Sequence, residues 1–327
     1  MKSDIRYAAT DDGSTLAIID LTHPSFSLAV TAAQLAAMSD QFLIESKQRG
    51  PMSPDVLKTL KESTLGSALM AAEGGFLSGL STYMFKLGPG QLPSDATVID
   101  QHIASSFPAF VMRIRLQDMA RLLADRLASA ATLTLHRPII FLNIAGGPAA
   151  DTWNTLLHLQ AEHPYLLDGR RIDVAILDVD HHGPSFGNRV LSILCEPGAP
   201  LSSLDVNYRH LTYNWSQTDQ LPDVLAGLHA ADAICAISSE GGLFEYGSDE
   251  QIIANLGALY ASTASDAFFV GSVTRDSELI RAAHAGIQIP TRPRTLEAFK
   301  ALVAQAGWTV QHLIERPMSY NVRLIKS

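Results

Sequence analysis

The chain has 327 residues, of which 47% are apolar and 17% are charged, so it can bury a sizeable core, and two domains are expected. This composition excludes an intrinsically disordered chain. The net charge of −9 at pH 7 disfavours nucleic acid as a partner, because binding to the phosphate backbone needs clustered Lys and Arg residues. The densest basic cluster, Arg292-Pro293-Arg294, is short.

The apolar segments and the cysteines indicate the cellular compartment of the protein. No apolar run reaches the roughly 18 residues that are needed to span a bilayer, and the polar N-terminus lacks an apolar signal segment. The two cysteines, Cys195 and Cys235, are too few for a disulfide framework, and no Cys/His spacing matches a zinc site. A soluble protein of the reducing cytoplasm is therefore expected, with no metal site and no membrane partner.

The first 130 residues are expected to form a mostly helical N-terminal unit. Residues Ile5–Leu21 alternate loosely around the turn signal Asp11-Asp12-Gly13, which is compatible with a short hairpin. Helical periodicity follows over Ala29–Glu45 and is strongest over Phe110–Leu127. No internal repeat interrupts this region.

After Leu135, strand patterns alternate with helix patterns, which indicates a parallel sheet with crossover helices. The predicted strands are Ile139–Ile144, Ile172–Leu177, Arg209–Tyr213, Ala233–Ile237, Ala267–Val273, Thr309–Glu315 and Asn321–Ile325. The predicted helices are Thr152–His163, Gly187–Leu194, Leu221–Leu228, Asp249–Ser262, Glu278–Ala285 and Thr295–Ala306. The prediction for residues 131–327 is an α/β domain with a Rossmann-like, seven-stranded, mostly parallel sheet that ends in an antiparallel hairpin.

One strand-to-helix turn is the main candidate for a binding site. Ile139–Leu142 is an unbroken apolar run, typical of a strand buried on both faces, and the small-residue turn Ala145-Gly146-Gly147-Pro148 follows it. Such a turn lets a ligand approach the backbone, and the next helix supplies free N–H groups and a positive dipole end. It has neither the Gly-Lys-Ser/Thr of a phosphate loop nor a clean G-x-G-x-x-G. It suits a nucleotide-like or carboxylate-bearing ligand, although a tight turn in any doubly wound fold has the same pattern.

The turn resembles the first motif of class I S-adenosylmethionine-dependent methyltransferases, which is an acidic residue, an apolar residue and then G-x-G-x-G. Asn143 stands in place of the acid, and Ala145, Gly147 and Ala149 stand in place of the three glycines. The ending is also similar, because the helix within Thr295–Trp308 closes in Ala-Gly-aromatic and is followed by a strand, a proline and a final strand. The resemblance covers about residues 138–327. It implies S-adenosyl-L-methionine as the cofactor and methyl transfer to a small-molecule acceptor.

The same resemblance implies which residues hold the cofactor, at the carboxyl ends of the strands. Asp178, or less closely Asp180, would bind the ribose hydroxyls, although either could be a helix-capping or turn aspartate. Asn214 would contact the adenine amine and Trp215 the adenine ring, unless Trp215 is ordinary core. The predicted cofactor-binding residues are Asn143, Ala145, Gly146, Gly147, Pro148, Asp178, Asp180, Asn214, Trp215, Ser238, Ser239 and Glu240.

A candidate catalytic residue comes from a second likeness. Ser248-Asp249-Glu250 at a helix start is similar to the small-molecule O-methyltransferases, whose general-base His falls on Glu245 here. A carboxylate can accept a proton from a hydroxyl, although methyl transfer can also proceed by positioning and desolvation. The acceptor is expected near Leu65–Gly90, under a lid from the N-terminal unit, which could equally mediate a homodimer. The aromatic residues that could shape this lid are Phe76, Tyr83 and Phe85.

Three alternatives stay open. The eroded glycines and Asn143 are compatible with a non-catalytic relic of the methyltransferase fold. The acid after the second strand is compatible with an NAD-dependent enzyme, although the first turn lacks the glycine pattern of that class and the paired final strands suit a methyltransferase better. Asp180-His181-His182 resembles the manganese-binding triplet of DHH-type phosphoesterases. Those enzymes also need upstream Asp and His motifs, and Asp11, Asp12 and His23 do not follow predicted strands.

Overall fold

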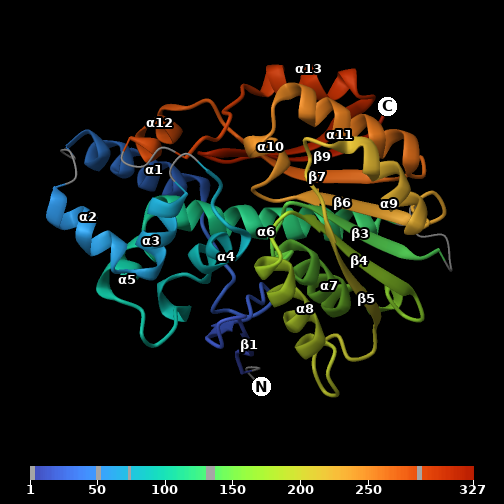
Figure 1. Ribbon diagram of the computed structural model, residues 1–327, viewed down its shortest axis with the longest axis horizontal. Helices are drawn as coiled ribbons and strands as arrows, with labels where there is room; N and C mark the ends of the chain where they lie inside the picture. The colour runs from blue at the N-terminus through green and yellow to red at the C-terminus, as the bar shows by residue number, and fades with distance from the viewer. Residues whose placement is uncertain (1–3, 49–52, 73–74, 130–136, 286–288) are drawn as a thin grey trace.

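The computed structural model describes residues 4–48, 53–72, 75–129, 137–285 and 289–327. In this described part, a seven-stranded sheet forms the centre of the molecule (Figure 1). Its strands are β3 (Ile139–Ile144), β4 (Arg171–Asp178), β5 (Asp205–Thr212), β6 (Ile234–Ser239), β7 (Phe268–Thr274), β8 (Trp308–Glu315) and β9 (Ser319–Lys326). They lie in the order β5-β4-β3-β6-β7-β9-β8, and β9 runs antiparallel to both β7 and β8. The predicted strands and the closing hairpin are confirmed.

Helices cover both faces of the sheet, which is why its central strands are so apolar. Every residue of β3, β6 and β7 is buried. Phe141 packs on one side with α6 (Phe107–Ala128), α7 (Ala150–Glu162) and α8 (His182–Leu194). Its neighbour Leu142 packs on the other side with α9 (Leu221–Gly227), α11 (Asp249–Ser262) and α13 (Leu296–Gln305). The alternation of side chains along a strand therefore divides the core into two layers.

The predicted helices between the strands are also found, with one clear difference at α8. This helix begins at His182, five residues before the predicted start at Gly187. The Asp180 carboxylate accepts hydrogen bonds from the backbone N–H groups of His182 (3.2 Å) and Gly183 (3.3 Å), so it satisfies the free donors of the first turn. The glycines and the proline in this turn weakened the helical pattern in the sequence.

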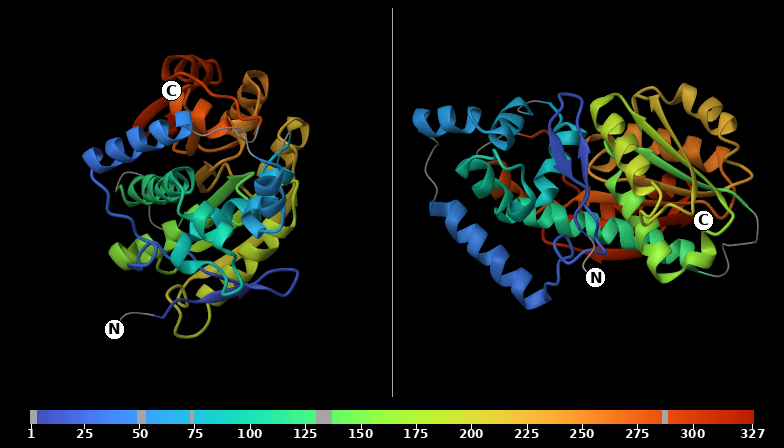
Figure 2. Two further views of the ribbon diagram at one scale, coloured as in Figure 1. Left: turned by 90° about the vertical axis from the view of Figure 1, so that its left-hand side faces the viewer. Right: turned by 90° about the horizontal axis from the view of Figure 1, so that it is seen from below.

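The N-terminal part begins with the expected hairpin, β1 (Tyr7–Ala9) paired with β2 (Thr15–Ala17). The helices that follow are α1 (Ala32–Gln48), α2 (Pro54–Lys61), α3 (Thr64–Ala71), α4 (Gly79–Leu87) and α5 (Val98–Ala104). The helices α1, α2 and α3 lie at one end of the long axis of the molecule, beside the sheet (Figure 1, and Figure 2, right). The helix α6 packs on α7, β7 and β9, and it also contacts α4 of the N-terminal part. The predicted division at residue 130 lies outside the described residues and stays a prediction.

Shorter elements complete the fold. They are the 3-10 turns η1 (Pro89–Gln91), η2 (Pro164–Leu166) and η3 (Thr218–Gln220), and the helices α10 (Leu243–Tyr246) and α12 (Glu278–His284). The sequence analysis missed α10, which is a single turn between two glycine-containing loops. None of the helices in the described ranges is both long and apolar enough to cross a bilayer.

Candidate functional site

A pocket of about 580 Å³, partly open to solvent, lies where β3, β4 and β6 end. Ala145 and Gly146 line it after β3, Asp178 and Asp180 line it at the end of β4, and Glu240 lines it after β6. After β3 the chain adds β4 and β5 on one side of that strand and then returns to add β6 on the other side, and open α/β sheets bind ligands at such a switch in strand order. The opposite wall comes from the segment 76–79 and from α4.

The turn after β3 has an unusual backbone. Ala145, Gly147 and Ala149 have φ values of 54°, 56° and 62°, so all three are in the left-handed region. For an alanine, this conformation costs about 1–2 kcal/mol. Two hydrogen bonds hold the turn against that cost: Ala145 N–H donates to Leu177 O (2.8 Å), and Gly147 N–H donates to Asp178 Oδ2 (3.0 Å). These three positions are the ones that match the three glycines of the methyltransferase motif.

Asp178 faces the pocket from the end of β4. Its Oδ2 accepts the Gly147 N–H, and its Oδ1 accepts the Asp180 N–H at 3.0 Å. Each oxygen therefore keeps a lone pair for a ligand hydroxyl. Burial raises the pKa of the Asp178 carboxyl, and the two N–H groups oppose that shift. Asp180 lines the same pocket while it caps α8, so a capping role and a ligand role coexist there.

A buried polar network lies beneath the turn. The Asn143 side-chain amide donates to Asp151 Oδ1 (2.9 Å) and to Ser238 Oγ (3.0 Å). Burial, and next the charge of Glu240, raises the pKa of the Asp151 carboxyl to about 6. The Ser239 hydroxyl donates to the last carbonyl of β3 (2.8 Å) and accepts the first N–H of α10 (2.9 Å). These side chains support the floor of the pocket from below.

Glycines allow three elements to meet at the turn. A Cβ atom on Gly79, the first residue of α4, would lie 2.4 Å from Gly147 Cα, and one on Gly183 would lie 2.9 Å from the same atom. A Cβ atom on Gly187 would lie 2.2 Å from the Pro148 carbonyl oxygen. Backbone therefore packs directly on backbone, and α4 and α8 cover Gly147 and Pro148.

An aromatic cluster forms one wall of the pocket. The ring of Phe76 lies 5.5 Å from that of Trp215 and 5.0 Å from that of Tyr246, and both contacts are edge-to-face. All three residues line the pocket, and Phe76 is 58% exposed. The other two aromatics expected in a lid, Tyr83 and Phe85, are core residues with 1% and 3% exposure.

Four buried charges join α4 and α6 to the segment that follows β6. Lys86 donates to Glu240 Oε2, Arg115 Nε donates to Glu240 Oε1 (2.7 Å), and Arg115 Nη1 donates to Glu245 Oε1 (2.5 Å). Each of the four residues is at most 8% exposed. Burial acts to raise the pKa of Glu240, but the charges of Lys86 and Arg115 outweigh it and hold that pKa below its usual value. Burial raises the pKa of Glu245, with Arg115 opposing the shift.

The structure brings half of the twelve predicted cofactor residues together at the pocket: Ala145, Gly146, Asp178, Asp180, Trp215 and Glu240. The other six are not among the described lining residues: Asn143, Gly147, Pro148, Asn214, Ser238 and Ser239. Asn214 is exposed, and its Oδ1 accepts the N–H two residues further on (3.0 Å). Glu245, the predicted base, is likewise not among the described lining residues.

The prediction missed several lining residues, above all Lys86 and Tyr246. It also missed Arg115, which holds the charged cluster in place. A signal for the two cations was present in the sequence. Lys86 stands inside the apolar segment Tyr83–Leu87, and Arg115 stands between Ile114 and Leu116 on the apolar face of its helix. A cation at a core position needs a buried anionic partner.

The histidine pair after β4 belongs to a separate cluster. His182 Nδ1 lies 2.7 Å from Asp11 Oδ2, and the ring of His181 lies 4.0 Å from that of His182 at a tilt of 38°. Ligand atoms of the three residues lie within 4.8 Å of one another, but all three are exposed, and Arg189 and Ser185 also bind Asp11. Hydrogen bonds of the hairpin to α8 account for this arrangement.

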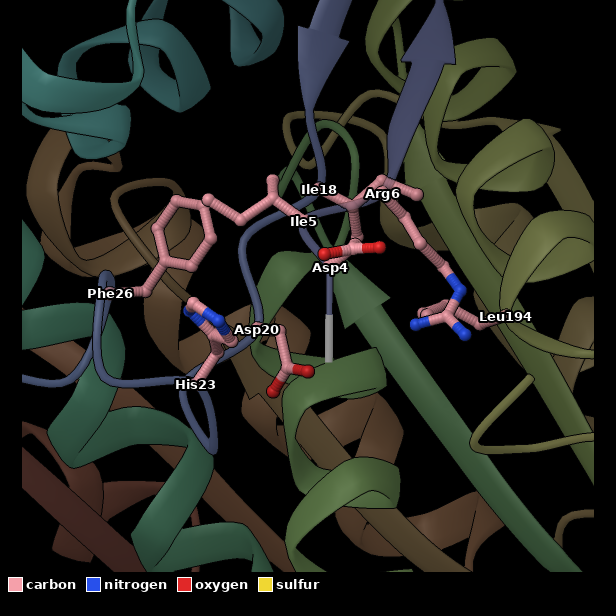
Figure 3. Close-up of a pocket in the computed structure, with 8 residues that line it drawn as sticks. All are labelled: Asp4, Ile5, Arg6, Ile18, Asp20, His23, Phe26 and Leu194. Carbon is pink, nitrogen blue, oxygen red and sulfur yellow. The ribbon is translucent and has the colours of Figure 1, made fainter. Parts of the chain in front are cut away.

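A smaller pocket of about 250 Å³ lies beside the N-terminal hairpin (Figure 3). Its lining residues are Asp4, Ile5, Arg6, Ile18, Asp20, His23, Phe26 and Leu194. Leu194 ends α8, whereas the main pocket lies at the start of that helix. The two pockets are therefore separated by the length of α8, roughly 18 Å.

No protein-family model matches the chain, and no curated protein matches its sequence. One similar solved structure is a possible exported protein from Bordetella parapertussis, 16% identical with a TM-score of 0.59, covering 91% of this chain and 97% of that one. Another is N,N-8-amino-8-demethyl-D-riboflavin dimethyltransferase from Streptomyces davawensis (13% identity, TM-score 0.42, 90% and 71% covered). A third is 1,6-didemethyltoxoflavin-N1-methyltransferase from Burkholderia thailandensis (15%, 0.40, 65% and 78%).

The chain has the predicted fold, a Rossmann-like, seven-stranded, mostly parallel sheet that ends in an antiparallel hairpin. The closing antiparallel hairpin is the ending that the resemblance to class I methyltransferases implies. At identities of 16% and below, the likeness to solved structures concerns the fold alone.

Proposed function

We propose that the chain is an S-adenosyl-L-methionine-dependent methyltransferase that acts on a small-molecule acceptor. The observation that carries this proposal is the turn after β3, where Ala145, Gly147 and Ala149 all have left-handed backbone. Two of these residues are alanines, which disfavour that conformation. Such a turn beside an open pocket at the switch in strand order suits a ligand that approaches the backbone closely, as an adenosyl group would.

The lining residues suit the parts of the cofactor. The Asp178 carboxylate has acceptor capacity for the two ribose hydroxyls, and the Trp215 ring offers a flat apolar surface to the adenine. Ala145 and Gly146 leave the backbone accessible to the methionyl part. When bound, the cofactor supplies an electrophilic methyl group on a positively charged sulfur.

The charge of the pocket favours this cofactor over a dinucleotide. Asp178, Asp180 and Glu240 line it, and among the described lining residues Lys86 is the one Lys or Arg. A surplus of carboxylates attracts the sulfonium and the amino group of S-adenosylmethionine and repels a pyrophosphate. This argues against the NAD-dependent alternative.

Calorimetric titration with S-adenosylmethionine and S-adenosylhomocysteine tests the proposal. The wild-type protein should bind both, and Asp178→Asn should weaken binding by at least about tenfold, which corresponds to about 1.4 kcal/mol. Asp219→Asn, at an exposed position in η3, is the matched control and should bind as wild type does. If the wild-type protein binds neither compound, the proposal is wrong and the non-catalytic relic is favoured.

The catalytic role of Glu245, the cytoplasmic location and the formation of a homodimer are further parts of this proposal. As a base, Glu245 would have to exchange its bond to Arg115 for a contact with the acceptor. A cytoplasmic location is supported by Cys195 and Cys235, neither of which is disulfide-bonded. The N-terminal helices remain the proposed site of homodimer formation.

A further inference from the structure

The cation in the wall of the pocket belongs to α4, within the segment Leu65–Gly90 that is expected beside the acceptor. Lys86 extends from α4, whose first residue rests on the turn after β3, and it lines the pocket together with Thr82 of the same helix. Its side chain is 5% exposed, and its hydrogen-bond partner within the described residues is Glu240. An ammonium group has three donors, so a single partner leaves Lys86 with capacity to bind a ligand oxygen.

The second oxygen of Glu240 is already committed. Arg115 binds Glu240 Oε1 and Glu245 Oε1 at the same time. The cluster therefore contains two cations and two carboxylates, and Arg115 serves both carboxylates. Glu240 is bound by Arg115 as well as by Lys86. An anionic ligand can therefore interact with the Lys86 ammonium while Arg115 continues to neutralise the Glu240 carboxylate.

The rest of the wall favours a flat ligand. Phe76 and Tyr246 present aromatic rings to the same pocket in edge-to-face contact with each other, and Phe76 also contacts Trp215, the residue proposed to face the adenine. Aromatic walls favour planar partners, which stack offset or edge-to-face. Together with a buried cation, they fit an aromatic ring that carries an ionisable hydroxyl.

We propose that Lys86 is a catalytic residue that binds the oxygen of a phenol-type acceptor and holds it as the phenolate, an inference that rests on the proposed methyl transfer. The phenolic proton passes to solvent as the acceptor ionises. The phenolate oxygen then forms a bond to the methyl carbon while the carbon–sulfur bond breaks and its electron pair stays on sulfur. The products are a neutral methyl ether and S-adenosylhomocysteine. This step needs no general base, which agrees with the engagement of Glu245 by Arg115.

The test uses 4-nitrophenol, whose phenolate absorbs visible light, as the probe. The full-length protein is saturated with S-adenosylhomocysteine, and the pKa of the bound probe is read from its absorbance across pH. Wild type should lower that pKa by about one unit, because the ammonium stabilises the anion. Lys86→Arg should keep the shift. Lys86→Met should abolish it and weaken probe binding by about tenfold, whereas Lys58→Met, at an exposed position on α2, should change neither.

A second variant distinguishes loss of the Lys86 charge from misfolding of the protein. Lys86→Met leaves the buried Glu240 with one partner fewer, so the double variant Lys86→Met/Glu240→Gln, which removes both charges, is measured beside it. A wild-type protein that binds S-adenosylhomocysteine but leaves the probe pKa unchanged overturns this inference alone. The same holds if the shift in the probe pKa persists in Lys86→Met or in the double variant Lys86→Met/Glu240→Gln. Failure to bind S-adenosylhomocysteine overturns the proposed function instead.

Discussion

The contact between Gly79 and Gly147 predicts the effect of one added methyl group. A Cβ atom on Gly79 would lie 2.4 Å from Gly147 Cα, whereas ordinary van der Waals contact begins at 3.4 Å. The substitution Gly79→Ala therefore has to separate α4 from the turn by 3.4 − 2.4 = 1.0 Å. The obstacle is backbone, so no side-chain rotation can relieve it.

The size of the effect follows from two opposing terms. Overpacking of this kind costs about 1–3 kcal/mol. Replacement of a glycine at the first position of a helix returns about 0.5–1 kcal/mol, because the unfolded chain becomes less flexible. Gly79→Ala should therefore lower the free energy of unfolding by up to roughly 2.5 kcal/mol. Gly257→Ala in α11 is the control, because in the described structure no heavy atom lies within 4 Å of the added Cβ. It should be neutral or stabilising by up to about 1 kcal/mol.

Urea denaturation followed by circular dichroism measures both variants, and titration with S-adenosylhomocysteine measures the site. Gly79→Ala should also weaken that binding by about tenfold, because the clash with Gly147 shifts the turn whose Ala145 and Gly146 line the pocket. Gly257→Ala should bind as wild type does. If the two variants are equally stable and bind equally well, then α4 does not rest on the turn, and the wall of the pocket is misplaced.

Two further predictions concern the buried charges. The pKa of the Asp151 carboxyl rises from 3.8 to about 6 in the folded protein, so its contribution to stability is present below about pH 4 and is lost as the pH rises through about 6. Asp151→Asn should therefore stabilise the protein at pH 8 by up to about 3 kcal/mol and much less at pH 4.5; an equal gain at both values in urea denaturation contradicts this. Arg115→Met removes the cation that binds the buried carboxylates of Glu240 and Glu245, so it should lower the free energy of unfolding by about 3–5 kcal/mol. Arg121→Met, which breaks a surface pair, should cost less than about 1 kcal/mol, and similar losses in the two variants would refute the argument.

The sheet could be predicted because each strand is marked by a pattern of consecutive residues in the sequence. Strands buried on both faces are continuous apolar runs, and the predicted bounds of β3, Ile139–Ile144, match those in the structure. The start of α8 was missed because a cap and not a periodicity determines it: the Asp180 carboxylate accepts the first N–H groups. Capping by aspartate is visible in a sequence only when the following residues have a helical pattern, and Gly183 and Pro184 obscured that pattern.

The site could be predicted only in part, because its walls come from distant segments. The residues that follow the strands, such as Asp178 and Glu240, were found from the rule that ligands bind at strand ends. Lys86 was not assigned to the site, and Phe76 was assigned only to a lid. Both residues reach the pocket because α4 packs on the turn, which the sequence does not show. Asn143 was assigned to the cofactor by its position in the motif, yet it points into the network below the turn. Alignment to a motif specifies the backbone position and not the side-chain direction.

The alanines at positions 145 and 149 show what determines such a turn. Glycine adopts left-handed backbone without strain, whereas each alanine adopts it at a cost of about 1–2 kcal/mol. The turn is nevertheless formed, because Leu177 O and Asp178 Oδ2 bind its N–H groups and α4 and α8 pack against Gly147. Tertiary contacts therefore specify the backbone, and glycines only reduce its cost. The number of glycines in a motif is thus a weaker test of the site than the φ angles at the matching positions.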